Sequence, residues 1–179
     1  MQAMPAPTPS RDHDARSTLS DPLVRELLAA RLVGVLATVR RDGAVDAVPM
    51  WYASDGEGVV LATGSRSRKV RNLEADPRAT LVLHDSRPGY EVCGASIAGT
   101  VEIVRAPSAR ELVELVHWRY LSVESAEDGS VRAFLDSDDV ALRLTPTTSV
   151  TWDERGSEAA EVVRARGWAL PLVTTRPRE

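Results

Sequence analysis

Short apolar runs separated by Asp-Gly turns constrain the fold of this chain more than any other feature. The first run, 33–39, is β-branched and ends at Asp42-Gly43, and the second, 44–53, ends at Asp55-Gly56 before a third run over 59–63. Asp-Gly between apolar runs is a strong hairpin signal, because it accommodates the positive φ angles of a tight turn. The sequence therefore predicts a meander of three antiparallel strands.

Further strand signals follow a short basic segment. The runs 79–84 and 90–104 predict a fourth and a long fifth strand, and 140–144 predicts a sixth that continues over 149–152. Pro49 cannot donate to a strand ladder, so a bulge or a free edge is expected in the second strand. Glycines in the fifth run permit the bends of a closed barrel. The predicted fold class is mainly β (α+β), a six-stranded antiparallel barrel with flanking helices.

Helix signals lie between and after the strands. Asp21 is expected to cap a helix that ends near Arg31, and Ser65 or Ser67 to cap a basic helix that ends at Asp76-Pro77. A Ser108-x-x-Glu111 capping box predicts a longer helix. Segment 124–139 is expected to be irregular, and 157–166 to be helical with Gly167 as its C-terminal cap.

Composition along the chain predicts three parts. Residues 1–20 hold several prolines and mixed charges and are expected to be a disordered tail. Residues 21–152 form the barrel domain, and 153–179 form a C-terminal extension. The apolar segment 168–173 of this extension is expected to dock, with a partner subunit as one candidate.

Composition also excludes several classes of protein. A net charge of −4 and few aromatic residues argue against a nucleic-acid-binding module, and no apolar run approaches the roughly 20 residues that span a bilayer. The N-terminus lacks the apolar core of a signal peptide, and a single cysteine, Cys93, fits a reducing compartment. The three histidines show no ligand spacing, so no metal site is expected. These features predict a cytoplasmic protein.

The densest cationic cluster lies where the third strand runs into the basic helix. Lys69, the only lysine among 22 basic residues, stands there with Arg66, Arg68 and Arg71. Phosphate binds well at such a junction, because a helix N-terminus offers free N–H donors and serine, arginine and lysine add hydroxyls and charge. A merely solvated basic surface is the alternative. The retained lysine favours the phosphate site, since ammonium and guanidinium groups differ in geometry and hydration.

Neither a nucleotide-binding glycine motif nor a set of serine, histidine and aspartate stands out, so the catalytic residues are unknown and the chemistry is expected to come from a cofactor. The order of the signals resembles the pyridoxamine 5'-phosphate oxidase-like split β-barrel superfamily, especially its deazaflavin-dependent branch. The resemblance covers about residues 23–150 and is carried by Pro49-Met50-Trp51, Asp55-Gly56, Ala62-Thr63, Ser67-Arg68-Lys69, Asn72-Leu73 and Asp76-Pro77-Arg78.

This resemblance implies a split barrel of the FMN-binding type that forms a homodimer, with two flavin or deazaflavin cofactors at the subunit interface. Arg68 and Lys69 match the cationic pair that binds the coenzyme phosphate, and Asn72 shares their side of the helix. The implied cofactor-binding residues are Val48, Pro49, Met50, Trp51, Thr63, Ser67, Arg68, Lys69 and Asn72. Trp51 is equally compatible with a core or interface aromatic residue.

Two positions depart from the pattern of pyridoxamine phosphate oxidases, and they narrow the choice of the implied cofactor. In the family that the sequence resembles, true pyridoxamine phosphate oxidases carry an arginine and a lysine in the second strand that bind the flavin phosphate. The matching positions in this sequence look like Ala47 and Tyr52. The resemblance therefore favours coenzyme F-420 (8-hydroxy-5-deazaflavin), with FMN as the alternative. Arg66 and Arg71 are then expected to meet the acidic polyglutamate tail of coenzyme F-420.

The resulting expectation is an oxidoreductase that transfers hydride to or from a small organic substrate. Tyr52, Tyr90 and solvent remain open as proton donors. The alternative is a non-catalytic carrier or sensor that binds flavin, haem or another small ligand in the same groove. No nucleic-acid or membrane partner is expected.

Overall fold

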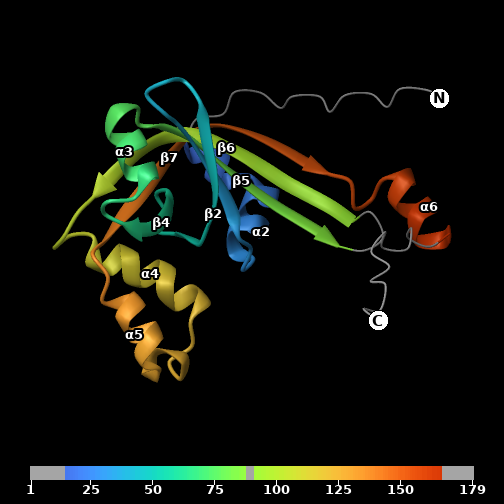
Figure 1. Ribbon diagram of the computed structural model, residues 1–179. Helices are drawn as coiled ribbons and strands as arrows, with labels where there is room; N and C mark the ends of the chain where they lie inside the picture. Colours follow the sequence, from blue (N-terminus) through green and yellow to red (C-terminus); the bar gives the residue numbers. More distant parts are fainter. Residues whose placement is uncertain (1–14, 88–90, 167–179) are drawn as a thin grey trace, which may run out of the picture.

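The computed structural model describes residues 15–87 and 91–166 and shows one antiparallel sheet curled into a half-barrel (Figure 1). Its seven strands follow the order β2-β1-β5-β6-β7-β4-β3. The strands are β1 Gly34–Val39, β2 Val45–Met50, β3 Tyr52–Ser54, β4 Val59–Gly64, β5 Arg78–Arg87, β6 Glu91–Val104 and β7 Asp139–Asp153. The predicted split barrel is confirmed, whereas the predicted number of six strands is wrong.

The extra strand arises because the predicted second strand divides at Trp51. β2 pairs with β1, whereas β3 pairs with β4 on the other side of the half-barrel. Pro49 lies in β2 at the free edge of the sheet, as predicted, where a missing N–H costs no ladder hydrogen bond. The chain therefore crosses from one edge of the sheet to the other at Trp51, so the two hairpins form but the predicted meander of three adjacent strands is wrong.

Long strands β5, β6 and β7 form the centre of the sheet. The register of β6 against β7 shifts between Ala98 and Gly99, which confirms the predicted bend. A Cβ atom on Gly99 would fall on the carbonyl oxygen of Thr145, so only glycine allows this approach. Pro146 pairs with Gly99 at the same irregularity, and β7 continues past it, as the predicted continuation of the sixth strand over 149–152 requires.

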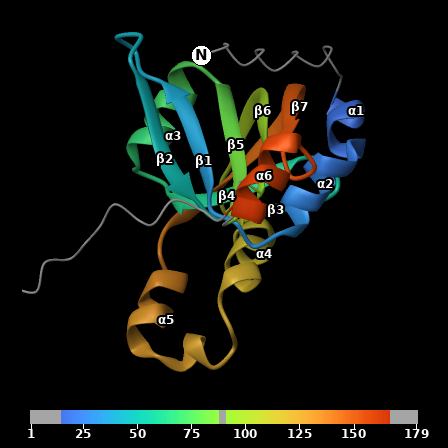
Figure 2. The same cartoon turned by 90° about the vertical axis from the view of Figure 1, so that its right-hand side faces the viewer.

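Helices pack against parts of both faces of the curled sheet. They are α1 Ala15–Ser20, α2 Pro22–Ala29, α3 Arg68–Ala75, α4 Arg110–Tyr120, α5 Gly129–Leu135 and α6 Glu158–Arg166, with a short 3-10 helix η1 at Ser125–Glu127. Apolar residues of α2 and α3 join the main core inside the half-barrel. α4 packs against β3, β4 and β7 through a second apolar cluster, and Figure 2 shows α4 and α5 extending beyond the strands.

Local helix signals were only partly right. Asp21 caps α2 as predicted, because its Oδ1 accepts from the amides of Leu23 at 2.8 Å and Val24 at 3.1 Å. The predicted capping box is wrong, since Ala109 occupies the cap position of α4 and no side chain bonds there. Helix α1, packed on β7, begins before the predicted start at Asp21.

The segment 124–139, expected to be irregular, instead contains η1 and α5. Asp128 caps α5 by accepting from the amide of Ser130 at 2.8 Å, which explains why this acidic stretch folds as a helix. α6 lies where a helix was predicted. Gly167 and the apolar segment 168–173 lie outside the described residues.

One face of β2, β1, β5, β6 and β7 carries exposed apolar side chains, and we call it the bare face. Val35, Val45 and Val150 are 39%, 65% and 40% exposed. The register places them with a continuous set of small or apolar residues, because residues opposite each other share a face. Two rows of this set are Pro49-Val35-Val82-Ser96-Val150 and Ala47-Ala37-Thr80-Ala98-Thr148.

Candidate functional site

The predicted phosphate site lies at the N-terminus of α3. Ser67 occupies the cap position but makes no side-chain cap bond, and the first turn holds no acidic residue. Lys69 Nζ donates to Thr63 Oγ1 at 3.0 Å, and the Thr63 hydroxyl donates to Ser67 Oγ at 3.4 Å. One ammonium, two hydroxyls and a positive helix end therefore converge, which is a favourable environment for an anion.

Lys69 differs electrostatically from a solvated surface lysine. Its side chain is half-buried, and burial lowers the pKa of the ammonium, while the nearby Asp139 carboxylate opposes this shift. A partly desolvated cation interacts with an anion more strongly than a hydrated one. Lys69 is thus placed to interact with an anion more strongly than a fully hydrated lysine would.

Arg68 and Asn72 do not share the position of Lys69. Arg68 Nη1 lies 3.7 Å from Asp46 Oδ1, and Asn72 Nδ2 donates to Asp46 Oδ2 and to Thr38 Oγ1, each at 3.0 Å. Asn72 is buried, so its amide ties α3 to β1 and β2. The cationic pair consequently points to two sides of the helix, Lys69 toward β4 and Arg68 toward β2.

A cavity of about 300 Å³ lies beside β2 and β4. Its lining comes from the β2–β3 junction, β4, α4 and α5 and consists of Pro49, Met50, Trp51, Ala62, Val116, His117 and Phe134. Three of the four predicted ring-binding residues are thus brought together, next to the Thr63 end of β4. The fourth, Val48, packs against the main core. We call this space the strand-two cavity.

Trp51 forms a fixed wall of this cavity. Its ring stacks on Tyr120 with centroids 4.8 Å apart and planes at 3°, and meets Phe134 edge-on at 6.1 Å. Such contacts hold the indole in one orientation. The aromatic residue therefore takes part in packing and also lines the cavity.

Sequence reasoning missed a buried pair, His117 and Asp139. His117 is 3% exposed, and its Nε2 lies 3.5 Å from Asp139 Oδ2. The hydrogen bond with His117 holds the pKa of Asp139 below its usual value. One available signal was helical spacing, because His117 lies four residues after Val113 on the inward side of α4.

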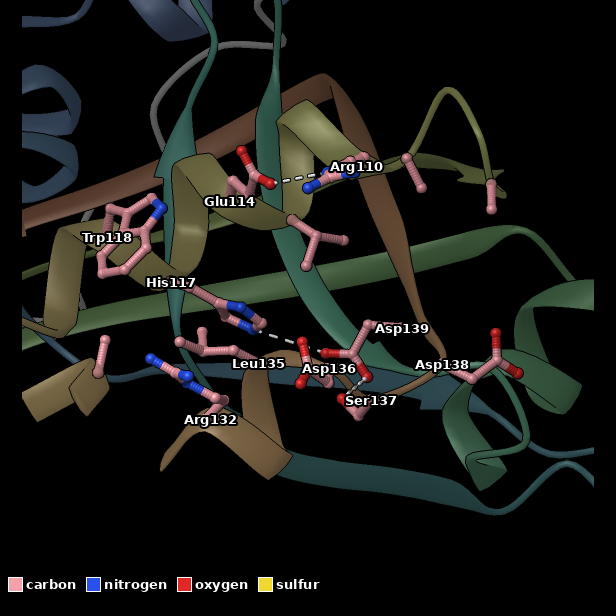
Figure 3. A pocket seen from close by; sticks show the side chains of 14 residues that line it. Arg110, Glu114, His117, Trp118, Arg132, Leu135, Asp136, Ser137, Asp138 and Asp139 are labelled. Carbon is pink, nitrogen blue, oxygen red and sulfur yellow. Dashed lines mark hydrogen bonds and ion pairs between the residues drawn. The ribbon is translucent and has the colours of Figure 1, made fainter. Parts of the chain in front are cut away.

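His117 also lines a second cavity, of about 610 Å³, between α4, α5 and the start of β7. Figure 3 shows His117 pointing toward Asp139, with Arg132, Asp136 and Trp118 around the same space. The two cavities therefore meet at one histidine. We call this larger space the α4–α5 cavity.

Tyr52, one of the candidate proton donors, is part of the hydrophobic core. It is fully buried, and its hydroxyl donates to the carbonyl oxygens of Leu27 at 2.7 Å and Ala30 at 3.0 Å. Burial raises the pKa of Tyr52 to about 12. Tyr90 lies outside the described residues.

Two further properties concern the described ranges, 15–87 and 91–166. Within them, no cluster of histidine, cysteine and carboxylate side chains could hold a metal ion. No helix in this part of the chain is long and apolar enough to cross a membrane.

Comparison with protein families shows which family the chain resembles. A family model described as pyridoxamine 5'-phosphate oxidase matches residues 20–153. The chain belongs to this family. The match spans the whole half-barrel, from α2 to the end of β7, and includes both cavities and the α3 site. No curated protein matches the sequence.

Solved structures agree with this membership in the pyridoxamine 5'-phosphate oxidase family. A conserved hypothetical protein, Rv2991 from Mycobacterium tuberculosis, is 30% identical, with a TM-score of 0.63 over 76% of this chain and 86% of that one. An F420 reductase is 28% identical, with a TM-score of 0.54 over 70% and 94%. HutZ, the haem storage protein of Vibrio cholerae, shares the fold at 16% identity, with a TM-score of 0.59 over 74% and 95%.

Proposed function

We propose that the protein is an oxidoreductase that uses coenzyme F-420, or alternatively FMN, to transfer hydride to or from a small organic substrate. The observation that carries the proposal is the uncapped N-terminus of α3, with Lys69, Thr63 and Ser67, beside the strand-two cavity. A phosphate group fits the first part because it needs donors and positive charge. A ring system fits the second, which is mostly apolar.

The residues of the chain have separate tasks in this proposal. Lys69, Thr63 and Ser67 hold the phosphate, and Arg68 adds charge from the side of β2. Pro49, Met50 and Trp51 orient the ring, while the stacked aromatic wall limits the access of water. When bound, the cofactor supplies or accepts the hydride.

Coenzyme F-420 is preferred over FMN for two reasons. Ala47 is uncharged and exposed, and Tyr52 is buried in the core, so neither position can hold the flavin phosphate that arginine and lysine would bind there. The similarity to an F420 reductase supports the same choice. Exposed Arg66 lies beside the helix end, where an acidic tail of the cofactor would emerge.

The proposal includes a homodimer formed through the bare face. Burying exposed valines on a second copy is favourable by about 25 cal/mol per Å² of apolar area. Pro49 belongs to both the bare face and the lining of the strand-two cavity. A second copy on this face would therefore lie next to the cofactor, and the site of one chain would be incomplete.

Titration of the cofactor-free protein with coenzyme F-420 and with FMN, followed by fluorescence, tests the proposal. We expect saturable binding with a lower Kd for coenzyme F-420. Reduced cofactor is then mixed with the loaded protein and with enones or quinones, and its absorbance reports hydride transfer. Binding of neither cofactor would refute the proposal, and binding without turnover would favour a carrier or sensor.

A further inference from the structure

His117, the buried histidine of α4, is not among the residues that bind the cofactor in the proposed function. His117 lies in the third turn of α4, and its ring packs on Phe134 with centroids 4.9 Å apart. Exposed Trp118, the next residue, lines only the α4–α5 cavity. His117 lines both cavities and so stands between the space proposed for the ring and a larger space between α4 and α5.

The Asp139 carboxylate lies on the Nε2 side of the imidazole. The Asp139 carboxylate lies 3.5 Å from Nε2 and also accepts a hydrogen bond from the Ser137 hydroxyl at 2.9 Å. In a neutral ring, this carboxylate favours the tautomer with the proton on Nε2. Nδ1 then carries a lone pair that the Asp139 carboxylate does not engage.

We propose that His117 is a catalytic residue that exchanges a proton through Nδ1 with a substrate bound against the cofactor ring at the strand-two cavity, and that Asp139 is its positioning residue. This inference rests on the proposed function and supplies the proton donor that it lacks. Substrates of the matching class carry a carbonyl group conjugated to a carbon–carbon double bond, since their reduction requires both a hydride and a proton.

The proton balance of the step is simple. A bound reduced cofactor would supply a hydride to the carbon remote from the carbonyl, and the electron pair of the double bond would move onto the carbonyl oxygen. His117, protonated on both nitrogens, gives the Nδ1 proton to the resulting enolate and becomes neutral. The other proton stays on Nε2, facing the Asp139 carboxylate. The α4–α5 cavity lets solvent protonate His117 again. Hydride and proton together complete a two-electron reduction.

A purely structural pair is the competing explanation, because a buried histidine is often retained only for its hydrogen bond. The two explanations differ in what a His117→Gln variant loses. A structural role predicts lower thermal stability with unchanged turnover of the protein that remains folded. A catalytic role predicts lower turnover with unchanged cofactor affinity.

The test compares wild type, His117→Gln and the control Glu111→Gln, which alters an exposed residue of the same helix. Each protein is titrated with coenzyme F-420 and FMN and assayed with cyclohex-2-enone and 1,4-naphthoquinone. We expect similar Kd values for all three and a kcat for His117→Gln that is lower by about 10²-fold or more. Wild-type kcat in His117→Gln would overturn the inference while leaving the proposed function intact.

Nitrogen-15 NMR of the wild-type imidazoles tests the same inference without a core mutation. We expect Nε2 of His117 to carry a proton in both the neutral and the cationic form of the ring, and the Nδ1 signal to shift when cyclohex-2-enone is added to the loaded protein. A neutral His117 ring with its proton on Nδ1, or an Nδ1 signal that saturating cyclohex-2-enone does not shift, would overturn the catalytic role of His117. Failure of wild type to bind either cofactor, or to reduce either acceptor, would remove the proposed reaction and the role of His117 with it.

Discussion

At the scale of single residues, Lys69 is the group on which we expect the affinity for the proposed cofactor to depend most. Lys69→Ala removes the ammonium that faces Thr63, and a charged hydrogen bond contributes about 1.5–3 kcal/mol. We therefore expect the Kd for coenzyme F-420 to rise by about 10- to 100-fold in a fluorescence titration. Arg31→Ala, an exposed change away from α3, is the control. Equal affinity of Lys69→Ala and wild type would show that phosphate does not bind at Lys69.

Tyr52 is the residue with the clearest effect on stability. Tyr52→Phe leaves the ring in place but removes the hydroxyl that bonds to Leu27 and Ala30 at the end of α2. The expected loss is about 1–3 kcal/mol in the free energy of unfolding, measured with urea. A loss close to zero would mean that the guanidinium of Arg119, which also donates to Ala30, satisfies this helix end by itself.

The same hydroxyl predicts a pH dependence. The pKa of Tyr52 rises from 10.0 to about 12 in the folded protein, so the unfolded chain loses this proton first. The stabilising contribution is complete below pH 10.0 and is lost as pH rises through about 12. Urea unfolding across this window is expected to show a steeper alkaline loss for wild type than for Tyr52→Phe. Parallel curves would contradict the assignment.

At the scale of elements, the bend of β6 at Gly99 shapes the half-barrel. Gly99→Ala places a methyl group on the Thr145 carbonyl, and the two backbones must separate. We expect a destabilisation of about 3 kcal/mol, seen as a lower Tm. The control is Gly129→Ala in α5, where an added Cβ meets nothing within 4 Å. Similar Tm values for the two variants would show that β6 can relax its bend.

At the scale of the whole molecule, the bare face predicts assembly. Val45→Lys places a charge at a 65% exposed position of that face, and the matched control Val123→Lys changes a 70% exposed valine before η1. In sedimentation experiments we expect dimers for wild type and the control, and monomers for Val45→Lys. Cofactor affinity should fall with the dimer, because Pro49 lies on the same face. A monomeric wild type would refute the proposed assembly.

Local signals in the sequence were enough to predict much of this molecule. The Asp-Gly hairpins, the Asp21 cap and the helix end at Asp76-Pro77 all depend on neighbouring residues, and the structure confirms them. The position of Lys69 at a strand-to-helix junction is local as well. Alternation and turn chemistry act over a few residues, so one sequence is sufficient to read them.

Tertiary structure alone decided the contacts between distant segments. The division of the second strand at Trp51 depends on its two partners, β1 and β4. His117 meets Asp139 because α4 packs on β7, and Asn72 reaches Asp46 because α3 packs on β1, the neighbour of β2. Periodicity shows which side chains point inward but not which ones they meet. The proposed phosphate anchor, Lys69, could therefore be predicted from the sequence, whereas the contact between His117 and Asp139 depends on how the curled sheet packs against α4.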